Sequence, residues 1–483
     1  MKKTFAIFIV ALTLVGTFAS RTYALSENQS VAIETLLNES TRMSGAPGMS
    51  VSIIDEGETY YISSGYADRE KKKPATENTL YELASVSKAF TGVGILLLEE
   101  QHRLSMTDPI QKYLPWISFN YKGVPIDMQT ITLNHFLHHT SGLTNEKHFQ
   151  DIPRGRSRDM LLKTVETLMD TELEFSPGQQ YQYGTINYDV LGLVIEIVSG
   201  KSYESFMADE VFHPLGLEHT YLYEEDAQNT GQMAQGYRTS FFMKSPYDAP
   251  DYAGNKPAGY IISDSKDMAR WMKIQMGTVE DIPDIFKKVV ENSHQGNQSV
   301  PADDGLYYAA GWLVNSDKSF IEHDGVNPTF STQVVLFPDK KRAIFLLTNS
   351  ADTYNSYIVE SINDILEGGS TVSYQKSVME ISDIILSSVT ILFTLLAILI
   401  FVLGLMRSER PKKGILIKKR KILMPILIAI TFSLFILIWI YPMFIGYNWA
   451  ALLVWQPYSL VTALISLAVL STSVTWFVWQ GSK

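Results

Sequence analysis

The sequence of 483 residues contains no cysteine. This absence excludes disulfide bridges, thiolate metal sites and a cysteine nucleophile. Basic residues are scarce between residues 25 and 380, where 28 of them stand against 49 acidic residues, a net charge of −21. A domain this acidic repels nucleic acid and anionic lipid headgroups, so neither is expected as a partner.

Several well-known motifs are incomplete. Gly200-Lys201-Ser202 resembles the end of a phosphate-binding loop, but Ile195 stands where the first glycine of that loop is required. His135 and His139 have the spacing of a zinc-binding helix, but Phe136 occupies the place of the glutamate. No serine lies in a Gly-x-Ser-x-Gly motif. These absences argue against an NTPase, a zinc protease and an α/β-hydrolase, and we expect no cofactor and no metal.

Long apolar runs occur at both ends of the chain. At the N-terminus, Lys2 and Lys3 precede an apolar run from Phe5 to Ala19, and a small residue follows at Ala24. This pattern predicts a signal peptide over residues 1–24, with an uncleaved anchor helix as the alternative. Either interpretation predicts that the chain is exported.

The C-terminal region, residues 376–483, is apolar except at residues 407–421. It predicts three transmembrane helices, at about Ile384–Met406, at Ile422–Ile445 and within Trp449–Trp479. The stretch 407–421 holds eight basic residues and one acid, and positive loops remain in the cytoplasm. This loop is therefore expected inside the cell, and residues 25–375 are expected outside it.

Residues 25–375 show no internal repeat or linker, which indicates one α/β (α+β) domain. Strand patterns occur near both of its ends, at Met49–Ile54, Thr59–Gly65, Tyr307–Val314, Ser319–His323, Ser331–Phe337 and Ala343–Leu347. Helical spacing dominates the middle, at Ala89–Glu100, Tyr188–Val198 and Met268–Met276. We expect an antiparallel sheet built from both chain ends, flanked by helices, with a helical subdomain and then the transmembrane tail.

The motif Ser-x-x-Lys occurs at Ser85–Lys88, Ser263–Lys266 and Ser373–Lys376. Only Ser85 follows a β-compatible segment and opens a long apolar helix, whose dipole favours negative charge at its N-terminus. Ser85 and Lys88 lie three residues apart and therefore share one helix face. Burial of that helix would lower the pKa of Lys88 from its ordinary value of about 10.4 and make the amine a base.

The segment Tyr81–Gly92 resembles the first motif of class C β-lactamases and penicillin-binding proteins. Three further segments resemble later motifs of that family in the expected order: the His-Thr-Ser-Gly-Leu loop at His138–Leu143, the Pro-Leu-Gly-Met turn at Pro214–Leu217, and a His-x-Gly motif at His323–Gly325. The resemblance covers roughly residues 30–370, and the three-helix tail is similar to that of FmtA-like proteins. It implies a serine hydrolase that forms an acyl-enzyme.

The second catalytic motif departs from the family pattern, which is usually Tyr-x-Asn. This chain has Tyr183, then Thr185 in place of the asparagine, and Asn187 two residues later. The resemblance implies that Tyr183 shares a proton with Lys88 and Ser85. Threonine is shorter than asparagine, which predicts weaker contacts with Lys88 and with a substrate carbonyl, and Asn187 is the alternative candidate for that role.

The resemblance also implies an oxyanion hole formed by the backbone N–H groups of Ser85 and Val326, beside His323 and Gly325. For His323, an edge-strand histidine without a role is the alternative. His138, His139 and Pro214 are assigned to structure.

These residues predict acyl-enzyme chemistry with Ser85, Lys88 and Tyr183 as catalytic residues. A position at the outer membrane face would bring the enzyme to D-alanyl peptides or esters of the cell wall, as a carboxypeptidase or esterase. The alternatives are a β-lactamase and, because the asparagine is missing, a catalytically weak penicillin-binding-like sensor or scaffold. The tail requires only an anchoring role, because its helices carry almost no ionisable residues.

Overall fold

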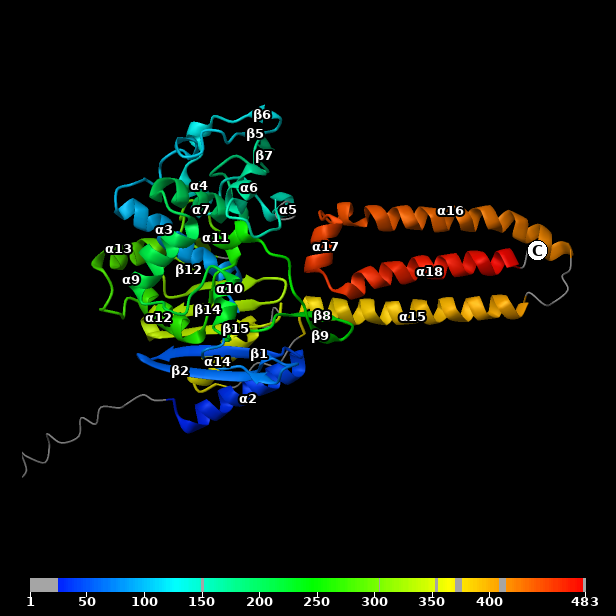
Figure 1. Cartoon of the computed structure of the whole chain (residues 1–483), viewed down its shortest axis with the longest axis horizontal. Helices are drawn as coiled ribbons and strands as arrows, with labels where there is room; N and C mark the ends of the chain where they lie inside the picture. The colour runs from blue at the N-terminus through cyan, green and yellow to red at the C-terminus, as the bar shows by residue number, and fades with distance from the viewer. Residues whose placement is uncertain are drawn as a thin grey trace, which may run out of the picture.

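The computed structural model describes residues 25–148, 152–303, 305–351, 355–369, 376–407 and 414–480. The predicted signal peptide and residues 408–413 of the predicted basic loop lie outside these ranges. The described chain forms a mixed domain of strands and helices, from which three long helices extend side by side (Figure 1).

An antiparallel sheet forms the centre of the domain. Its eight described strands run in the order β11 (Leu306–Tyr308), β12 (Leu313–Asn315), β13 (Ile321–Val326), β14 (Ser331–Phe337), β15 (Arg342–Thr348), β1 (Gly48–Asp55), β2 (Glu58–Asp68) and β3 (Lys73–Pro74). The N-terminal strand β1 pairs with the C-terminal strand β15, so that Met49 lies opposite Thr348. The predicted α/β (α+β) class, with a sheet built from both chain ends, is confirmed.

One predicted strand is wrong in its extent. Tyr307–Val314 forms two strands, β11 and β12, which pair with each other in a hairpin. The chain reverses near Gly311, whose φ of 81° is a left-handed conformation that glycine adopts without strain. The β-rich composition of the segment therefore indicated strand structure correctly but did not reveal the turn.

Helices cover both faces of the sheet. On one face, α2 (Glu27–Ser44) and α14 (Asn355–Leu366) cover one set of alternating apolar residues, including Val51, Ile53 and Ile344. On the other face lie α12 (Ser265–Gln275) and, around the main core, α3 (Ser87–Glu100), α7 (Ile186–Ser199), α11 (Lys256–Gly259) and α13 (Asp284–Ser293). Helix α3 is buried without interruption from Ser87 to Leu98, so it is the central helix of the domain.

The predicted helical subdomain lies beside α3 and α7. Its short helices are α4 (Leu133–Leu137), α5 (Asn145–His148), α6 (Met160–Glu166), α8 (Tyr203–Phe206), α9 (His213–Leu215) and α10 (Glu224–Asn229). Smaller sheets are formed by β5 (Phe119–Tyr121) with β6 (Val124–Pro125) and β7 (Thr171–Glu172), by β8 (Tyr237–Ser240) with β9 (Met243–Pro246), and by β4 (Tyr81–Glu82) with β10 (Ile262–Ser263).

The C-terminal tail contains α15 (Val378–Arg407), α16 (Gly414–Phe444), α17 (Trp449–Trp455) and α18 (Tyr458–Gln480). Three of these described helices, α15, α16 and α18, are long and apolar enough to cross a membrane. The third predicted block is divided, because Gln456 is extended before Pro457, a position where proline disfavours helix. Helix α17 lies at the end of the bundle nearest the domain (Figure 1).

Candidate active site

Ser85 lies in a single 3₁₀ turn, Ala84–Val86, between β4 and α3. Ala84 has a φ of 47°, a left-handed conformation that is costly for a residue other than glycine and persists only where the surroundings fix it. Ser85 lines a cleft with a volume of about 770 Å³. The turn therefore places the serine at the start of the central helix and at the edge of an open cleft.

The Lys88 side chain is fully buried and reaches the serine from the next turn of the chain. Its Nζ atom lies 3.1 Å from Ser85 Oγ, 3.1 Å from Thr185 Oγ1 and 2.7 Å from the backbone oxygen of Ala258. Burial lowers the pKa of Lys88 to about 7. A substantial fraction of the amine is therefore neutral at pH 7 and can accept the Ser85 proton.

The structure distinguishes Thr185 from Asn187. Thr185 lines the cleft, and its hydroxyl contacts Lys88. The sequence predicted that this contact would be weaker than that of an asparagine. The buried Asn187 amide accepts a hydrogen bond from Ser141 Oγ at 2.6 Å and lies 3.1 Å from His139 Nδ1. Thr185, and not Asn187, therefore occupies the place beside Lys88.

Tyr183 lies over the lysine, with Lys88 Nζ 4.9 Å from the centre of its ring. Its hydroxyl oxygen is buried, and its interaction with Ser85 partly offsets the effect of burial on its pKa. Burial raises the pKa of Tyr183 well above its usual value of 10, so the phenol stays protonated. The His139 ring is also buried, and its centre lies 4.5 Å from the centre of the Tyr183 ring. This packing agrees with the structural role assigned to His139.

Strand β13 forms the opposite side of the serine. His323 is buried, its Nε2 atom lies 3.0 Å from the Tyr308 hydroxyl, and burial lowers its pKa to about 4, so it is neutral at pH 7. At Gly325, an added Cβ would lie 2.8 Å from the backbone nitrogen of Ser85 and 2.7 Å from the backbone oxygen of Leu83. Glycine therefore lets the strand approach the serine closely.

The strand ladder sets the direction of the Val326 amide. Asn327 N–H donates to Phe330 O at 2.8 Å, and Val326 is paired opposite Ser331. Because bonded and non-bonded pairs alternate along an antiparallel ladder, the Val326 N–H points away from β14. Val326 also lines the cleft, so its amide is oriented as an oxyanion donor requires.

Several contributors to the site were not predicted from the sequence. The Ala258 carbonyl contacts Lys88 from a segment 170 residues away. Asp324 is exposed in the cleft, and Asn327 donates to the Gly259 carbonyl at 2.8 Å. Four tail residues, Ile445, Gly446, Tyr447 and Trp455, also line the cleft. Asp324 could have been found from its place between His323 and Gly325, but a backbone carbonyl and a docked tail leave no motif.

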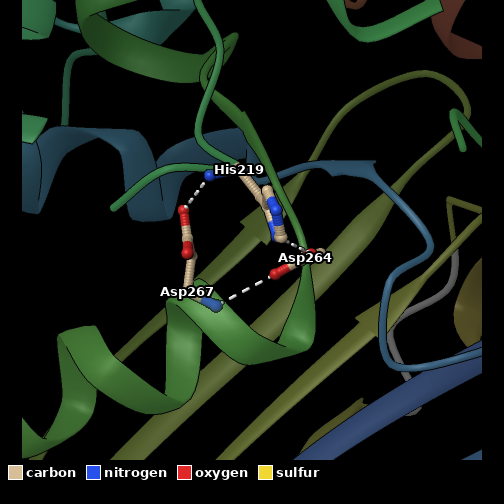
Figure 2. A group of neighbouring side chains, drawn as sticks. All are labelled: His219, Asp264 and Asp267. Carbon is tan, nitrogen blue, oxygen red and sulfur yellow. Dashed lines mark hydrogen bonds and ion pairs between the residues drawn. The ribbon is translucent and has the colours of Figure 1, made fainter. Parts of the chain in front are cut away.

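A separate cluster has a composition that could ligate a metal ion: His219, Asp264 and Asp267 (Figure 2). Asp264 caps α12 by accepting from the backbone nitrogens of Lys266 and Asp267, and the His219 ring lies 2.9 Å from its carboxylate. Asp267 accepts from the His219 backbone and from Thr220 Oγ1. These bonds account for the cluster as a helix cap that fixes the segment before α12.

Comparison with known proteins agrees with this geometry. The sequence profile of the β-lactamase family matches residues 33–366. The chain belongs to the β-lactamase family. Among its relatives, Protein flp of Staphylococcus aureus (strain MW2) is 28% identical over 473 residues, which cover 95% of this chain and 92% of that protein. Penicillin-binding protein 4* of Bacillus subtilis (strain 168) is 27% identical and covers 64% of this chain and 70% of that protein.

Two solved structures share the fold. A penicillin-binding protein homologue from Pyrococcus abyssi superposes with a TM-score of 0.62 at 25% identity, covering 74% of this chain and 81% of that one. A class C β-lactamase superposes with a TM-score of 0.61 at 20% identity, covering 72% and 99%. The predicted resemblance is confirmed, and the family is one of serine hydrolases and penicillin-binding proteins.

Proposed function

We propose that this β-lactamase-family protein is a membrane-anchored serine hydrolase that forms an acyl-enzyme on Ser85. The observation that carries the proposal is the 3.1 Å approach of Lys88 Nζ to Ser85 Oγ, made by a buried amine whose pKa is lowered to about 7. A nucleophile with a base at hydrogen-bond distance is the basic unit of acyl transfer.

In the proposed reaction, Ser85 Oγ attacks a carbonyl carbon and its proton passes to Lys88. The amides of Ser85 and Val326 stabilise the negative charge on the carbonyl oxygen. Tyr183 and Lys88 deliver a proton to the leaving group as its bond to the carbonyl carbon breaks. Water then attacks the acyl-enzyme and releases the acid, which restores the serine.

The charges in the cleft favour a cationic acyl group. None of the described residues that line the cleft is lysine or arginine, His323 is neutral at pH 7, and Asp324 is exposed there. A free ammonium of an aminoacyl ester can pair with Asp324. None of the described residues that line the cleft offers a positive charge to the carboxylate of a penicillin or of a terminal D-alanine, so we propose D-alanyl esters of wall polymers as substrates ahead of D-alanyl peptides.

The proposed location is the outer face of the cell membrane. The chain is anchored by α15, α16 and α18, with the basic loop 407–421 inside and the catalytic domain outside.

The second candidate function is a catalytically weak sensor or scaffold. It is supported by Thr185, which stands where the family usually has asparagine.

Two measurements test the function. A fluorescent fluorophosphonate should label the full chain, and labelling and ester hydrolysis should be lost in Ser85→Ala and fall more than about a hundredfold in Lys88→Ala. A chain that folds but hydrolyses no ester would favour the sensor or scaffold.

The substrate class is tested by comparing a D-alanyl ester with its N-acetylated form, which lacks the positive charge. The wild type should prefer the charged ester by about tenfold or more, and Asp324→Asn should remove most of that preference. An unchanged preference in Asp324→Asn would contradict the assignment of the ammonium to this carboxylate.

A further inference from the structure

The cleft that contains Ser85 is bounded on one side by the membrane tail. Ile445, Gly446, Tyr447 and Trp455, together called the tail wall, line the same cleft as Ser85. They belong to the connection between α16 and α18, two of the helices that are long enough to cross a membrane. The anchor therefore contributes part of the wall of the site.

Specific contacts hold this connection against the domain. The Arg154 guanidinium donates to the Ala450 carbonyl at 2.7 Å, and the buried Arg238 donates to the Leu453 carbonyl at 2.8 Å. Arg238 also stacks on Tyr458, with its guanidinium carbon 4.0 Å from the ring centre. Because these contacts fall on α17 and on the first residue of α18, the tail wall has a fixed place beside the cleft.

A further contact fixes the position of the β8–β9 hairpin along helix α15. The Asp383 carboxylate, within the apolar stretch of α15, accepts hydrogen bonds from the backbone nitrogens of Phe241 and Phe242 at 3.0 and 2.7 Å. Phe242 and Met243, at the tip of the β8–β9 hairpin, are 52% and 63% exposed. The tip lies level with the start of α15, where exposed aromatic side chains favour the membrane interface (Figure 1).

We infer that the site takes its acyl ester from a lipid held in the outer leaflet, with the tail wall in contact with the lipid-linked part of the leaving group. This inference rests on the proposed function and narrows its substrate class. A lipid keeps its acyl chains in the membrane, so a hydrolase reaches its headgroup most readily through a cleft that opens at the interface. Ile445, Tyr447 and Trp455 supply an apolar and aromatic wall at that level.

The charge of the domain agrees with an aminoacylated headgroup. Residues 25–380 carry a net charge of −21 and repel an anionic headgroup. A D-alanyl ester on that headgroup adds one ammonium, which offsets one negative charge and can pair with Asp324. Hydrolysis breaks the bond between the acyl carbon and the lipid oxygen, so the products are D-alanine and a lipid alcohol.

The test uses the full chain in phosphatidylcholine vesicles and two probes with the same ester bond. D-alanyl-phosphatidylglycerol is held in the vesicle, whereas D-alanyl-glycerol is soluble. The wild type should show a kcat/KM at least tenfold higher for the lipid probe, and Tyr447→Ala and Trp455→Ala should each reduce this ratio severalfold to tenfold. Trp439→Ala is the matched control, because Trp439 is 74% exposed on α16 and does not line the cleft, and it should keep the wild-type ratio.

A wild-type kcat/KM that is equal or higher for the soluble probe would overturn this inference alone. The inference would also be overturned if Tyr447→Ala and Trp455→Ala both kept the wild-type ratio of kcat/KM for the lipid probe to kcat/KM for the soluble probe, with thermal unfolding showing that both variants are folded. The comparison of the two probes on the wild type is a test by itself. The inference can therefore be refuted even if both variants fail to fold. No turnover of either probe, with no fluorophosphonate labelling of Ser85, would instead overturn the proposed function and this inference with it.

Discussion

Lys88 links burial directly to the pH range of the proposed reaction. Its amine is surrounded by α3, the Ala258 carbonyl and the rings of Tyr183 and Tyr188, and this loss of solvent lowers its pKa to about 7. The base form is the neutral amine, which predominates above the lowered pKa and is lost as the pH falls through it. A lysine left in solvent would be protonated at every physiological pH.

We therefore predict that kcat/KM for a soluble ester falls about tenfold per pH unit below about pH 7 and is level above it. The measurement is a rate profile between pH 4 and 9, with circular dichroism as a check that the protein stays folded. An inflection near pH 4 would instead assign the base to His323, whose pKa is lowered to about 4.

Thr185 determines which acyl donors can be held beside Lys88. An asparagine at this position can donate an amide hydrogen to the carbonyl of a peptide or β-lactam, which the shorter threonine does not reach. We predict that Thr185→Asn raises the second-order rate of penicillin acylation, since an unpaired polar group in a buried site is costly. Ester turnover, measured in parallel, shows whether the site remains intact. Equal acylation rates in both forms would show that Thr185 is not the functional counterpart of the family's asparagine.

At the scale of elements, the approach of β13 to the start of α3 builds the site. Gly325→Ala would place a methyl group 2.6 Å from Thr332 Oγ1 and against the backbone of Leu83 and Ser85. Two of these neighbours are backbone atoms, so the strand must shift. We predict a loss of about 1–3 kcal/mol in the free energy of unfolding and a large loss of ester hydrolysis.

Thermal unfolding and ester turnover measure these effects. Gly259→Ala is the control for stability, because the nearest atoms to its added methyl lie at an ordinary contact distance of 3.6 Å. A Gly325→Ala variant as stable and active as the wild type would contradict the close packing of β13 against Ser85.

Local patterns predicted most elements but not how they meet. Strand alternation and helix spacing gave β1, β2, β14, β15 and α3, because these signals depend on neighbouring residues. Pro457 is a local signal for the division of the third apolar block, which hydrophobicity alone does not reveal. The Ala258 carbonyl and the tail wall depend on contacts between segments far apart in the chain, which no single sequence pattern records. The sequence placed Thr185 opposite Lys88 with Asn187 as the alternative, and only the three-dimensional contacts decide between them.

For the whole molecule, orientation in the membrane decides which substrates can be reached. We predict that alkaline phosphatase is active when fused near Lys376, and that a cytoplasmic reporter is active when fused within Lys412–Lys421, because basic loops stay inside. Fusions expressed in intact cells measure both. The opposite pattern would contradict the proposed localisation and the wall substrate together.

The pairing of β1 with β15 sets the order of events when the chain is made. In the export that we propose, β1 and β2 emerge early, while the strand that must pair with β1 arrives only after Arg342 has crossed the membrane. Until then β1 offers an open edge to other chains and to proteases. Helix α15 follows soon after β15, so the sheet closes only as the nascent chain is about to be anchored. The yield of active protein should therefore depend on chaperones that act at the exit of the secretion channel.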